Sequence, residues 1–190
     1  MPEAEMWTYY GYREVTGTVR RVGINFGAPG NRRAAGGTLW LEQPRAGGAS
    51  YRLPVTTVPS NPEVFRRHAS WLEHGERTWV GASGVKGMTS AVVTLAEAGA
   101  AARRYTVRLH FVEPDGLPAG ERVFDLALQG RPVLSEFDVS REAGGQRRVI
   151  VKEFRGIRVT QELKVTLTPS ACAPDSVPVL CGIEIVAEGY

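Results

Sequence analysis

The polar residues that could do chemistry do not have the spacing that a catalytic site requires. No glycine-rich phosphate loop or Gly-x-Ser-x-Gly nucleophile turn is present, and residues 81–84 have the wrong spacing for the latter. His68 and His74 stand six positions apart, whereas two zinc-binding histidines on one helix face normally stand one turn apart. Asp125 lies within an expected strand and Asp138 just beyond one, positions where a carboxylate ordinarily hydrogen-bonds a loop. These patterns favour a binding protein over an enzyme and indicate no metal or cofactor.

Aromatic residues in expected loops are the stronger functional signal. Tyr51, Trp71 and Trp79 fall in segments that we interpret as loops. The apolar faces of sugar rings stack on aromatic planes, while neighbouring polar side chains hydrogen-bond the hydroxyl groups. Core packing is the competing explanation for such residues. For Trp40 and Trp79 we favour core packing. For Tyr51 and Trp71 core packing and ligand binding are equally compatible with the sequence. These residues make carbohydrate the first ligand class to consider.

The elements that would position these loops are short β-strands. Residues 105–111 alternate apolar and polar side chains, which predicts a half-buried strand with His110 on its solvent-facing side. Residues 122–129 repeat this pattern and turn into 133–137, which predicts a hairpin. Further strands are expected at residues 19–26, 38–41, 78–80, 91–96, 147–154, 163–168 and 180–186. Short strands separated by turns indicate an all-β sandwich or jelly roll.

One short helix is expected among these strands. Ser60, Pro62 and Glu63 combine a capping residue, an early proline and a capping-box glutamate. This pattern predicts a helix over about residues 63–72.

Composition and charge indicate one soluble domain. A chain of 190 residues with 22 Gly, 12 Pro and 43% hydrophobic residues suits a single turn-rich core, expected at residues 17–190. Residues 1–16 would be an aromatic extension, or the tail of a preceding domain. The net charge is +3, but the Arg-Arg pairs are spread along the chain among 20 acidic residues, which argues against nucleic-acid binding. No apolar run is long enough to span a membrane, and no signal-peptide pattern is present.

The two cysteines could form a disulfide. Pro174 and Pro178 favour turning of the segment between Cys172 and Cys181, which predicts that the two thiols lie close enough to bridge. Two free thiols are equally compatible with this spacing, because two cysteines alone do not fix a redox compartment.

Six short segments, taken in order, resemble malectin and malectin-like carbohydrate-binding modules over about residues 19–187. The segments are 24–27, 61–63, 109–113, 122–126, 130–138 and 178–185. The resemblance implies a jelly-roll β-sandwich of the galactose-binding-domain-like kind, in agreement with the strand pattern. It also implies a non-catalytic accessory module of a larger bacterial surface or secreted protein, with an extracytoplasmic location and with neighbouring domains as partners.

In malectin, aromatic loop residues and one aspartate hold a glucose disaccharide, and the resemblance carries these positions over one by one. Tyr51 resembles the first binding tyrosine, Trp71 lies near the second, and Asp175 resembles the binding aspartate. Asn25 and Arg52 are lesser candidates for ligand contact. A glycan, glucose-containing in the family, is therefore the expected partner.

The chain departs from the family after Glu113. Asp115 and Gly116 stand where malectin has two adjacent aromatic residues. Half of the aromatic residues that contact the sugar in malectin are therefore absent, and selectivity for a glucose disaccharide does not carry over. We expect dissociation constants no tighter than roughly micromolar. The alternative is a structural or protein-interaction module that has lost glycan binding.

Overall fold

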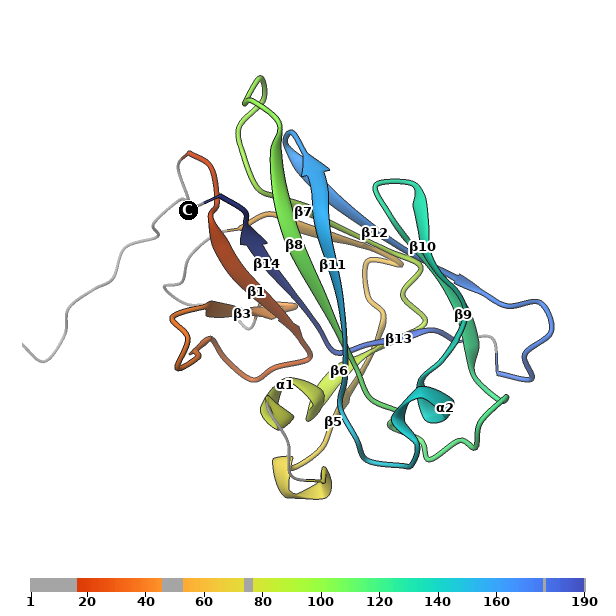
Figure 1. The fold of residues 1–190 in the computed structure, drawn as a ribbon. Helices are drawn as coiled ribbons and strands as arrows, with labels where there is room; N and C mark the ends of the chain where they lie inside the picture. The colour runs from red at the N-terminus through yellow and green to blue at the C-terminus, as the bar shows by residue number, and fades with distance from the viewer. Residues whose placement is uncertain (1–16, 46–52, 74–76, 176, 190) are drawn as a thin grey trace, which may run out of the picture.

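The computed structural model describes residues 17–45, 53–73, 77–175 and 177–189. Within these residues two large β-sheets pack against each other, with a small third sheet and two short α-helices towards one end of the molecule (Figure 1). This arrangement confirms the predicted all-β sandwich. The expected extension at residues 1–16 lies outside the described residues.

The first sheet contains both the first and the last strand of the described residues. In spatial order its strands are β11 (Ile150–Val159), β8 (Arg103–Phe111), β14 (Gly182–Ala187), β1 (Arg21–Phe26), β3 (Leu39–Gln43) and β2 (Arg32–Arg33). Neighbouring strands are antiparallel except β1 and β3, which run parallel. The register places Gly23 of β1 between Glu184 and Trp40 of its neighbours.

The second sheet contains the predicted hairpin. In spatial order its strands are β10 (Arg131–Asp138), β9 (Val123–Leu128), β12 (Glu162–Pro169), β7 (Ser90–Thr94) and β4 (Val55–Val58). Between β9 and β10, Gln129 and Gly130 both have positive φ angles, 52° and 75°. Two consecutive left-handed residues match the twist of antiparallel strands, so this pair closes the hairpin tightly.

The core lies between these two sheets. The six side chains predicted to face it are at most 1% exposed: Val107, Leu109, Phe111, Phe124, Leu126 and Leu128. Phe137 of β10 completes an aromatic group, with its ring centroid 4.9 Å from that of Phe111 and 5.5 Å from that of Phe124. The alternating pattern therefore predicted the correct inner face for β8 and β9.

Two predicted elements are wrong, and both belong to the small sheet or its connections. Residues 63–72 form strand β5 (Glu63–Arg66) and a 3-10 turn, η1 (Ala69–Trp71), in place of a helix. β5 pairs with β6 (Ser83–Lys86), which in turn pairs with β13 (Val179–Leu180). Long-range strand pairing satisfies the backbone of residues 63–66, so the local capping pattern does not prevail.

The expected strand at residues 78–80 is the helix α1 (Thr78–Gly81). A second helix, α2 (Val139–Ala143), begins at Asp138, whose carboxylate accepts from the backbone N–H of Arg141 at 3.1 Å. The role expected for Asp138, a structural hydrogen bond, is thus observed. No helix in the described part of the chain is both long and apolar enough to span a membrane.

His110 is buried, which corrects its predicted position on a solvent-facing side. Helix α1 covers that part of the outer face of the first sheet, and the ring of His110 packs edge-on against Trp40 with centroids 5.2 Å apart. Trp40 packs in the same manner against Trp79, at 5.4 Å. Burial, followed by the charge of Arg77, lowers the pKa of His110 from 6.5 to about 4, so the imidazole is neutral at pH 7.

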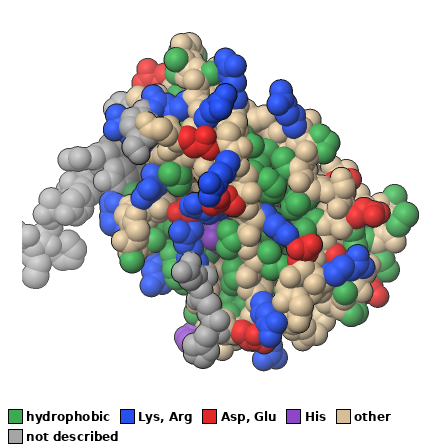
Figure 2. All heavy atoms as spheres, in the orientation of Figure 1, with side chains coloured by type: hydrophobic (Ala, Val, Ile, Leu, Met, Phe, Trp, Pro, Cys, Tyr) green, Lys and Arg blue, Asp and Glu red, His purple; other side chains and the backbone are tan. Residues whose placement is uncertain are grey.

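Ion pairs occupy the outer face beside this aromatic group. Glu184 accepts from Arg77, from Arg108 at 3.0 Å and from Thr38 at 2.8 Å, while Arg108 also donates to Glu153 at 2.6 Å. Burial raises the pKa of the Glu184 carboxyl, but these donors outweigh it and leave that pKa lowered. On the side shown in Figure 2, basic side chains interleave with acidic ones.

Of the two alternatives left open for Cys172 and Cys181, the structure has the free thiols. Cys172 is exposed, whereas Cys181 is fully buried between β13 and β14, and both thiols are free. The backbone N–H of Cys181 donates to the carbonyl of His110 at 2.9 Å, which fixes its place in the core layer. Burial raises the pKa of the Cys181 thiol, so this cysteine acts as a small apolar core residue.

Candidate functional site

A cavity of about 450 Å³ opens where the chain leaves β1, next to α1 and β5. Its walls combine small apolar side chains, such as Ala28 and Ala69, with the ring of Trp79 and the polar groups of Asn25 and Ser83. A concave, mostly apolar wall with a few fixed polar groups is typical of a small-molecule site, and the volume falls within the usual range of roughly 300–1,000 Å³.

Gly27 allows the chain to turn tightly beside this cavity. Its φ is 70°, and a Cβ there would lie 2.9 Å from Cγ1 of Val64 and 3.0 Å from the carbonyl oxygen of Gly84. Only glycine accommodates both the left-handed backbone and this close approach. The carbonyl of Gly27 accepts a hydrogen bond from Nε of Arg66 at 2.5 Å, which joins the end of β1 to the end of β5.

Three arginines line the cavity: Arg32, Arg66 and Arg67. The guanidinium of Arg32 lies over the ring of Trp79, 4.7 Å from its centroid. Arg67 donates from Nη1 to the carbonyl of Arg66 at 3.2 Å and from Nη2 to the carbonyl of Pro114 at 3.4 Å. Each guanidinium is thus positioned by a ring or a backbone carbonyl.

Two of the predicted site residues lie in or beside this cavity. Asn25 lines it with only 4% of its surface exposed, and its Oδ1 accepts from the hydroxyl of Ser83 at 3.4 Å. Trp71, in η1, is half-buried, and the guanidinium groups of Arg67 and Arg147 lie 5.9 and 5.6 Å from its ring centroid. Arg67 therefore contacts both the cavity and Trp71.

Asp175 lies in a separate ionic cluster. Nη2 of the buried Arg122 donates to Oδ2 of Asp175 and to Oδ2 of Asp115, each at 2.8 Å. Nη1 of Arg122 donates to both carboxylate oxygens of Glu113, at 3.1 and 2.9 Å. The structure thus brings Asp175 next to the position where malectin has its aromatic pair, and Oδ1 of Asp175 also accepts from the N–H of Val177 at 2.8 Å.

Burial and the neighbouring charges in this cluster shift the pKa values of its carboxyl groups. Burial raises the pKa of Asp115, but hydrogen bonds from Arg122 and Lys86 outweigh it, so the pKa of that carboxyl is lowered. Burial raises the pKa of Glu113 despite its bonds to Arg122. In the described part of the chain, no group of three or more His, Cys, Asp or Glu side chains could hold a metal ion. His68, one of the two histidines considered for zinc, instead accepts from the N–H of Ser70 at 3.3 Å.

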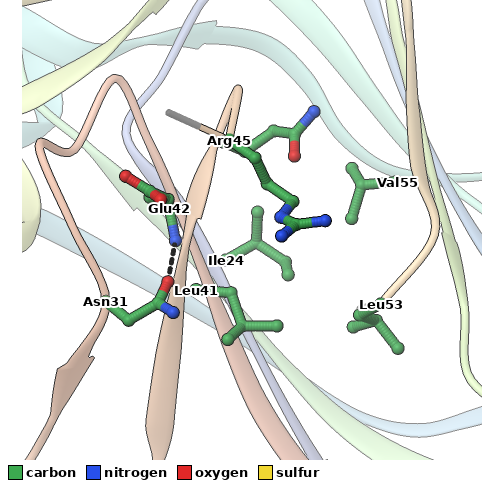
Figure 3. A pocket seen from close by; sticks show the side chains of 8 residues that line it. Ile24, Asn31, Leu41, Glu42, Arg45, Leu53 and Val55 are labelled. Carbon is green, nitrogen blue, oxygen red and sulfur yellow. Dashed lines mark hydrogen bonds between the residues drawn. The ribbon is translucent and has the colours of Figure 1, made fainter. Parts of the chain in front are cut away.

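Tyr51 and Arg52 lie outside the described residues, in the segment that joins β3 to β4. The hollow nearest to this segment is shown in Figure 3, where Ile24, Leu41 and Val55 surround the side chain of Arg45. Its volume of about 10 Å³ has room for one water molecule at most, so this hollow is not a ligand site.

Sequence reasoning missed the three arginines of the cavity. The pairs Arg32-Arg33 and Arg66-Arg67 stand far apart in the sequence, which by itself indicates dispersed charge. The fold gathers Arg32, Arg66 and Arg67 at one opening. Core packing is the role that the sequence favours for Trp79. In the structure Trp79 packs against Trp40 and also lines the cavity.

Comparisons with known proteins agree with the sequence resemblance and with the fold. The malectin domain family model matches residues 97–172, which confirms the resemblance for the part of the chain from β8 to β12. A probable LRR receptor-like serine/threonine-protein kinase from Arabidopsis thaliana is 30% identical over 69 residues, which cover 33% of this chain and 7% of the kinase.

Solved structures share the architecture at low identity. The extracellular domain of ANXUR1 from Arabidopsis thaliana superposes with a TM-score of 0.68 at 14% identity, over 89% of this chain and 48% of that one. A Bacteroides uniformis beta-glucuronidase superposes with a TM-score of 0.63 at 13% identity, over 89% of this chain and 18% of that one. The chain therefore spans less than half the length of these proteins, and the likeness at such identities concerns the fold.

Proposed function

We propose that the chain is a non-catalytic carbohydrate-binding module whose ligand occupies the cavity bordered by Asn25, Arg67 and Trp79. The cavity itself carries this proposal. It combines apolar walls with amide, hydroxyl and guanidinium groups, which suits a ligand that has apolar ring faces and many hydroxyls. The match of residues 97–172 to the malectin domain supports the same ligand class.

The chemistry of the lining side chains supports binding rather than catalysis. The cavity is lined by arginine, asparagine, serine, tryptophan, alanine, proline and glycine. General acid–base catalysis relies mostly on histidine, carboxylate, lysine, tyrosine or cysteine side chains placed at the reacting atoms, and none of these is among the described residues that line the cavity. Such a site can hold a ligand by hydrogen bonds and charge without transforming it.

The sequence-predicted residues would extend the site beyond the cavity. Arg67 contacts Trp71 and the carbonyl of Pro114, the residue before Asp115. Asp115 shares the guanidinium of Arg122 with Asp175. In our proposal an oligosaccharide follows this path from the cavity towards Asp175, while Tyr51 and Arg52 contact it from the β3–β4 connection.

The proposal also concerns the larger protein to which the module belongs and where that protein is located. The proteins with the same fold are longer than this chain, and one of these structures is an extracellular domain. We propose that residues 17–190 are an accessory domain of a larger extracytoplasmic protein, of bacterial origin as the family resemblance implied, with residues 1–16 leading from a neighbouring domain. Glucose-containing glycans are the first ligands to test, because the family resemblance points to them.

One specific observation favours the alternative, a structural or protein-interaction module. Asp115 and Gly116 replace the aromatic pair of malectin, and Arg122 ties Asp115 to Asp175. Both carboxylates thus already have a partner inside the protein. In this alternative the cluster stabilises the loops and no sugar binds there.

A glycan array probed with the labelled full chain tests the proposal. We expect selective binding to one class of glycan, with dissociation constants no tighter than roughly micromolar in calorimetry. Tyr51→Ala and Asp175→Ala should each weaken that binding. Arg131→Ala is the control, because Arg131 is an exposed residue at the start of β10 and does not line the cavity. A clean negative across neutral and acidic glycans would favour the alternative.

A further inference from the structure

We infer that the cavity selects anionic sugars, those that carry a carboxylate or a sulfate group, through Arg32, Arg66 and Arg67. This inference rests on the proposed carbohydrate-binding function and adds the chemical class of the ligand. A neutral glucan, which the family resemblance places first, would then bind more weakly than a charged glycan of the same backbone.

The three arginines differ in their pairing from arginines elsewhere in the molecule that bind protein carboxylates. Arg77, Arg108 and Arg122 each bind carboxylates of the protein. Within the described ranges, the guanidinium groups of Arg32, Arg66 and Arg67 form no ion pair, and their contacts are with a ring or with backbone carbonyls. The cavity therefore presents three uncompensated positive charges.

These guanidinium groups are held in place but keep most of their donors. Arg32 stacks on Trp79, Arg66 uses Nε for Gly27, and Arg67 uses its Nη atoms for two carbonyls. A guanidinium has five N–H donors, so several remain directed to other acceptors. Groups that are already positioned lose less conformational entropy when a ligand binds.

An anion satisfies this arrangement better than a neutral hydroxyl group does. Carboxylate and sulfate oxygens accept charge-assisted hydrogen bonds, and the planar guanidinium can donate two parallel bonds to them. An anion between the arginines also removes their mutual repulsion. No carboxylate of the protein is among the described residues that line the cavity, so nothing there competes with the ligand for these charges.

Asn25 supplies a further donor to the lining of the cavity. Its side chain is almost completely buried, and its amide nitrogen has no hydrogen-bond acceptor among the described residues. This nitrogen is not sealed from solvent, so a water molecule or a ligand oxygen in the cavity can accept its hydrogen bond. We assign this N–H group to a ligand oxygen, which orients the sugar ring relative to the arginines.

The test uses an array of matched glycans and the full chain. Each neutral oligosaccharide is printed beside the same oligosaccharide oxidised at C6 to the uronic acid and beside its 6-sulfated form. We expect binding to one or both charged forms and at least about tenfold weaker binding to the neutral form, the effect of one charge-assisted hydrogen bond. The oxidised and sulfated arms distinguish which anion is preferred.

The array distinguishes a failure of the anionic selectivity from a failure of carbohydrate binding itself. Equal or stronger binding of neutral members would overturn the anionic selectivity and leave carbohydrate binding intact. Absence of binding to all members would overturn the proposed function, and the inference with it.

Variants connect the selectivity to the arginines. Arg32→Gln and Arg67→Gln should each weaken binding of the charged glycan by about tenfold and change the neutral form little. Arg33→Gln is the matched control, because Arg33 adjoins Arg32 on β2 but bonds to the carbonyl of Gly37 and does not line the cavity. Circular dichroism checks that each variant is folded.

Salt provides an independent readout. Raising the sodium chloride concentration should weaken wild-type binding more steeply than that of Arg32→Gln, since exposed charges are screened by salt. Two results would overturn the assignment of selectivity to these arginines. One is an equal loss of affinity for the charged glycan in Arg32→Gln and Arg33→Gln. The other is the same salt dependence of binding in wild type and Arg32→Gln.

Discussion

Arg122 shows, at the scale of the residue, how buried charge stabilises the loops at the end of the sandwich. Its side chain and that of Glu113 are 4% and 2% exposed, and they bond through Nη1. Arg122→Met would leave the Glu113 carboxylate buried without its cation. We expect the free energy of unfolding in urea to fall by about 3–5 kcal/mol.

The control for this variant is Arg155→Met. Arg155 also pairs with a glutamate, Glu153, but its side chain is 79% exposed, and such pairs contribute little. The free energy of unfolding should change by no more than about 0.5 kcal/mol. Similar losses in the two variants would show that burial of Arg122 does not matter.

His110 should make stability depend on pH. Burial lowers its pKa to about 4 in the folded protein, whereas the unfolded chain titrates near 6.5. Between these values the unfolded state binds the additional proton, so stability is complete above pH 6.5 and is lost as the pH falls towards 4. We expect the free energy of unfolding to decrease by about 2 kcal/mol from pH 7 to pH 5.

A His110→Gln variant isolates this effect. Urea titrations at pH 7 and pH 5 should show little change in its stability, even if its absolute stability is lower. Carboxyls with a lowered pKa, such as Asp115 and Glu184, lose their contribution only below this interval. An equal pH dependence in wild type and variant would assign the titration to another group.

Two of the candidate residues from the sequence lie at the proposed site, and their role in binding stays a prediction. Asn25 lines the cavity, and Trp71 lies beside Arg67, which also lines it. Arg32 and Arg67 could not be assigned, because their meeting depends on the close approach of β1 and β5 at Gly27. The burial of His110 could not be predicted either, since an alternating strand does not reveal that a short helix covers its outer face.

At the scale of the element, β1 and β14 depend on glycines that make room for an aromatic ring. A Cβ on Gly23 would lie 2.2 Å from Cδ2 of Trp40. Gly23→Ala should therefore displace Trp40 from the sheet, change the tryptophan fluorescence and lower the melting temperature by about 5 °C. Gly36→Ala, where nothing lies within 4 Å of the added Cβ, should do neither. Unchanged melting of Gly23→Ala would contradict this packing.

The strand β9 contributes the ring of Phe124 to the core. Phe124 is fully buried and packs against Phe111 and Phe137. Phe124→Ala should lower the free energy of unfolding by about 3–5 kcal/mol, enough to unfold a domain of ordinary stability. Thermal or urea unfolding measures this, and a melting temperature equal to that of wild type would mean that the inner face of β9 is misassigned.

Strands with long alternation were predictable as elements, and short connecting elements were not. The patterns at residues 105–111 and 122–129 specify one buried face, and both form the expected strands β8 and β9. The capping pattern at residues 60–63 was misleading, because β5 finds a partner in β6 that is distant in the sequence. Helix α1 has only four residues, too few for any helical period to show in the sequence.

For the whole molecule, the arrangement of charge matters more than its sum. The net charge of +3 indicates little by itself, and acidic and basic side chains interleave on the face shown in Figure 2. At the cavity the fold instead collects arginines without acidic partners among the described residues. A surface of mixed charge with one positive cavity suits a module that recognises a small charged unit of a larger glycan.

The central claim is that this cavity is the glycan site, and an amide chemical-shift map tests it most directly. The nitrogen-15-labelled chain is titrated with the oligosaccharide that binds best on the array. We predict the largest shifts at the side-chain amide of Asn25, the indole N–H of Trp79 and the backbone of Arg67. Shifts that leave these three unchanged and gather at the β9–β10 turn, around Gln129 and Gly130, would contradict the account.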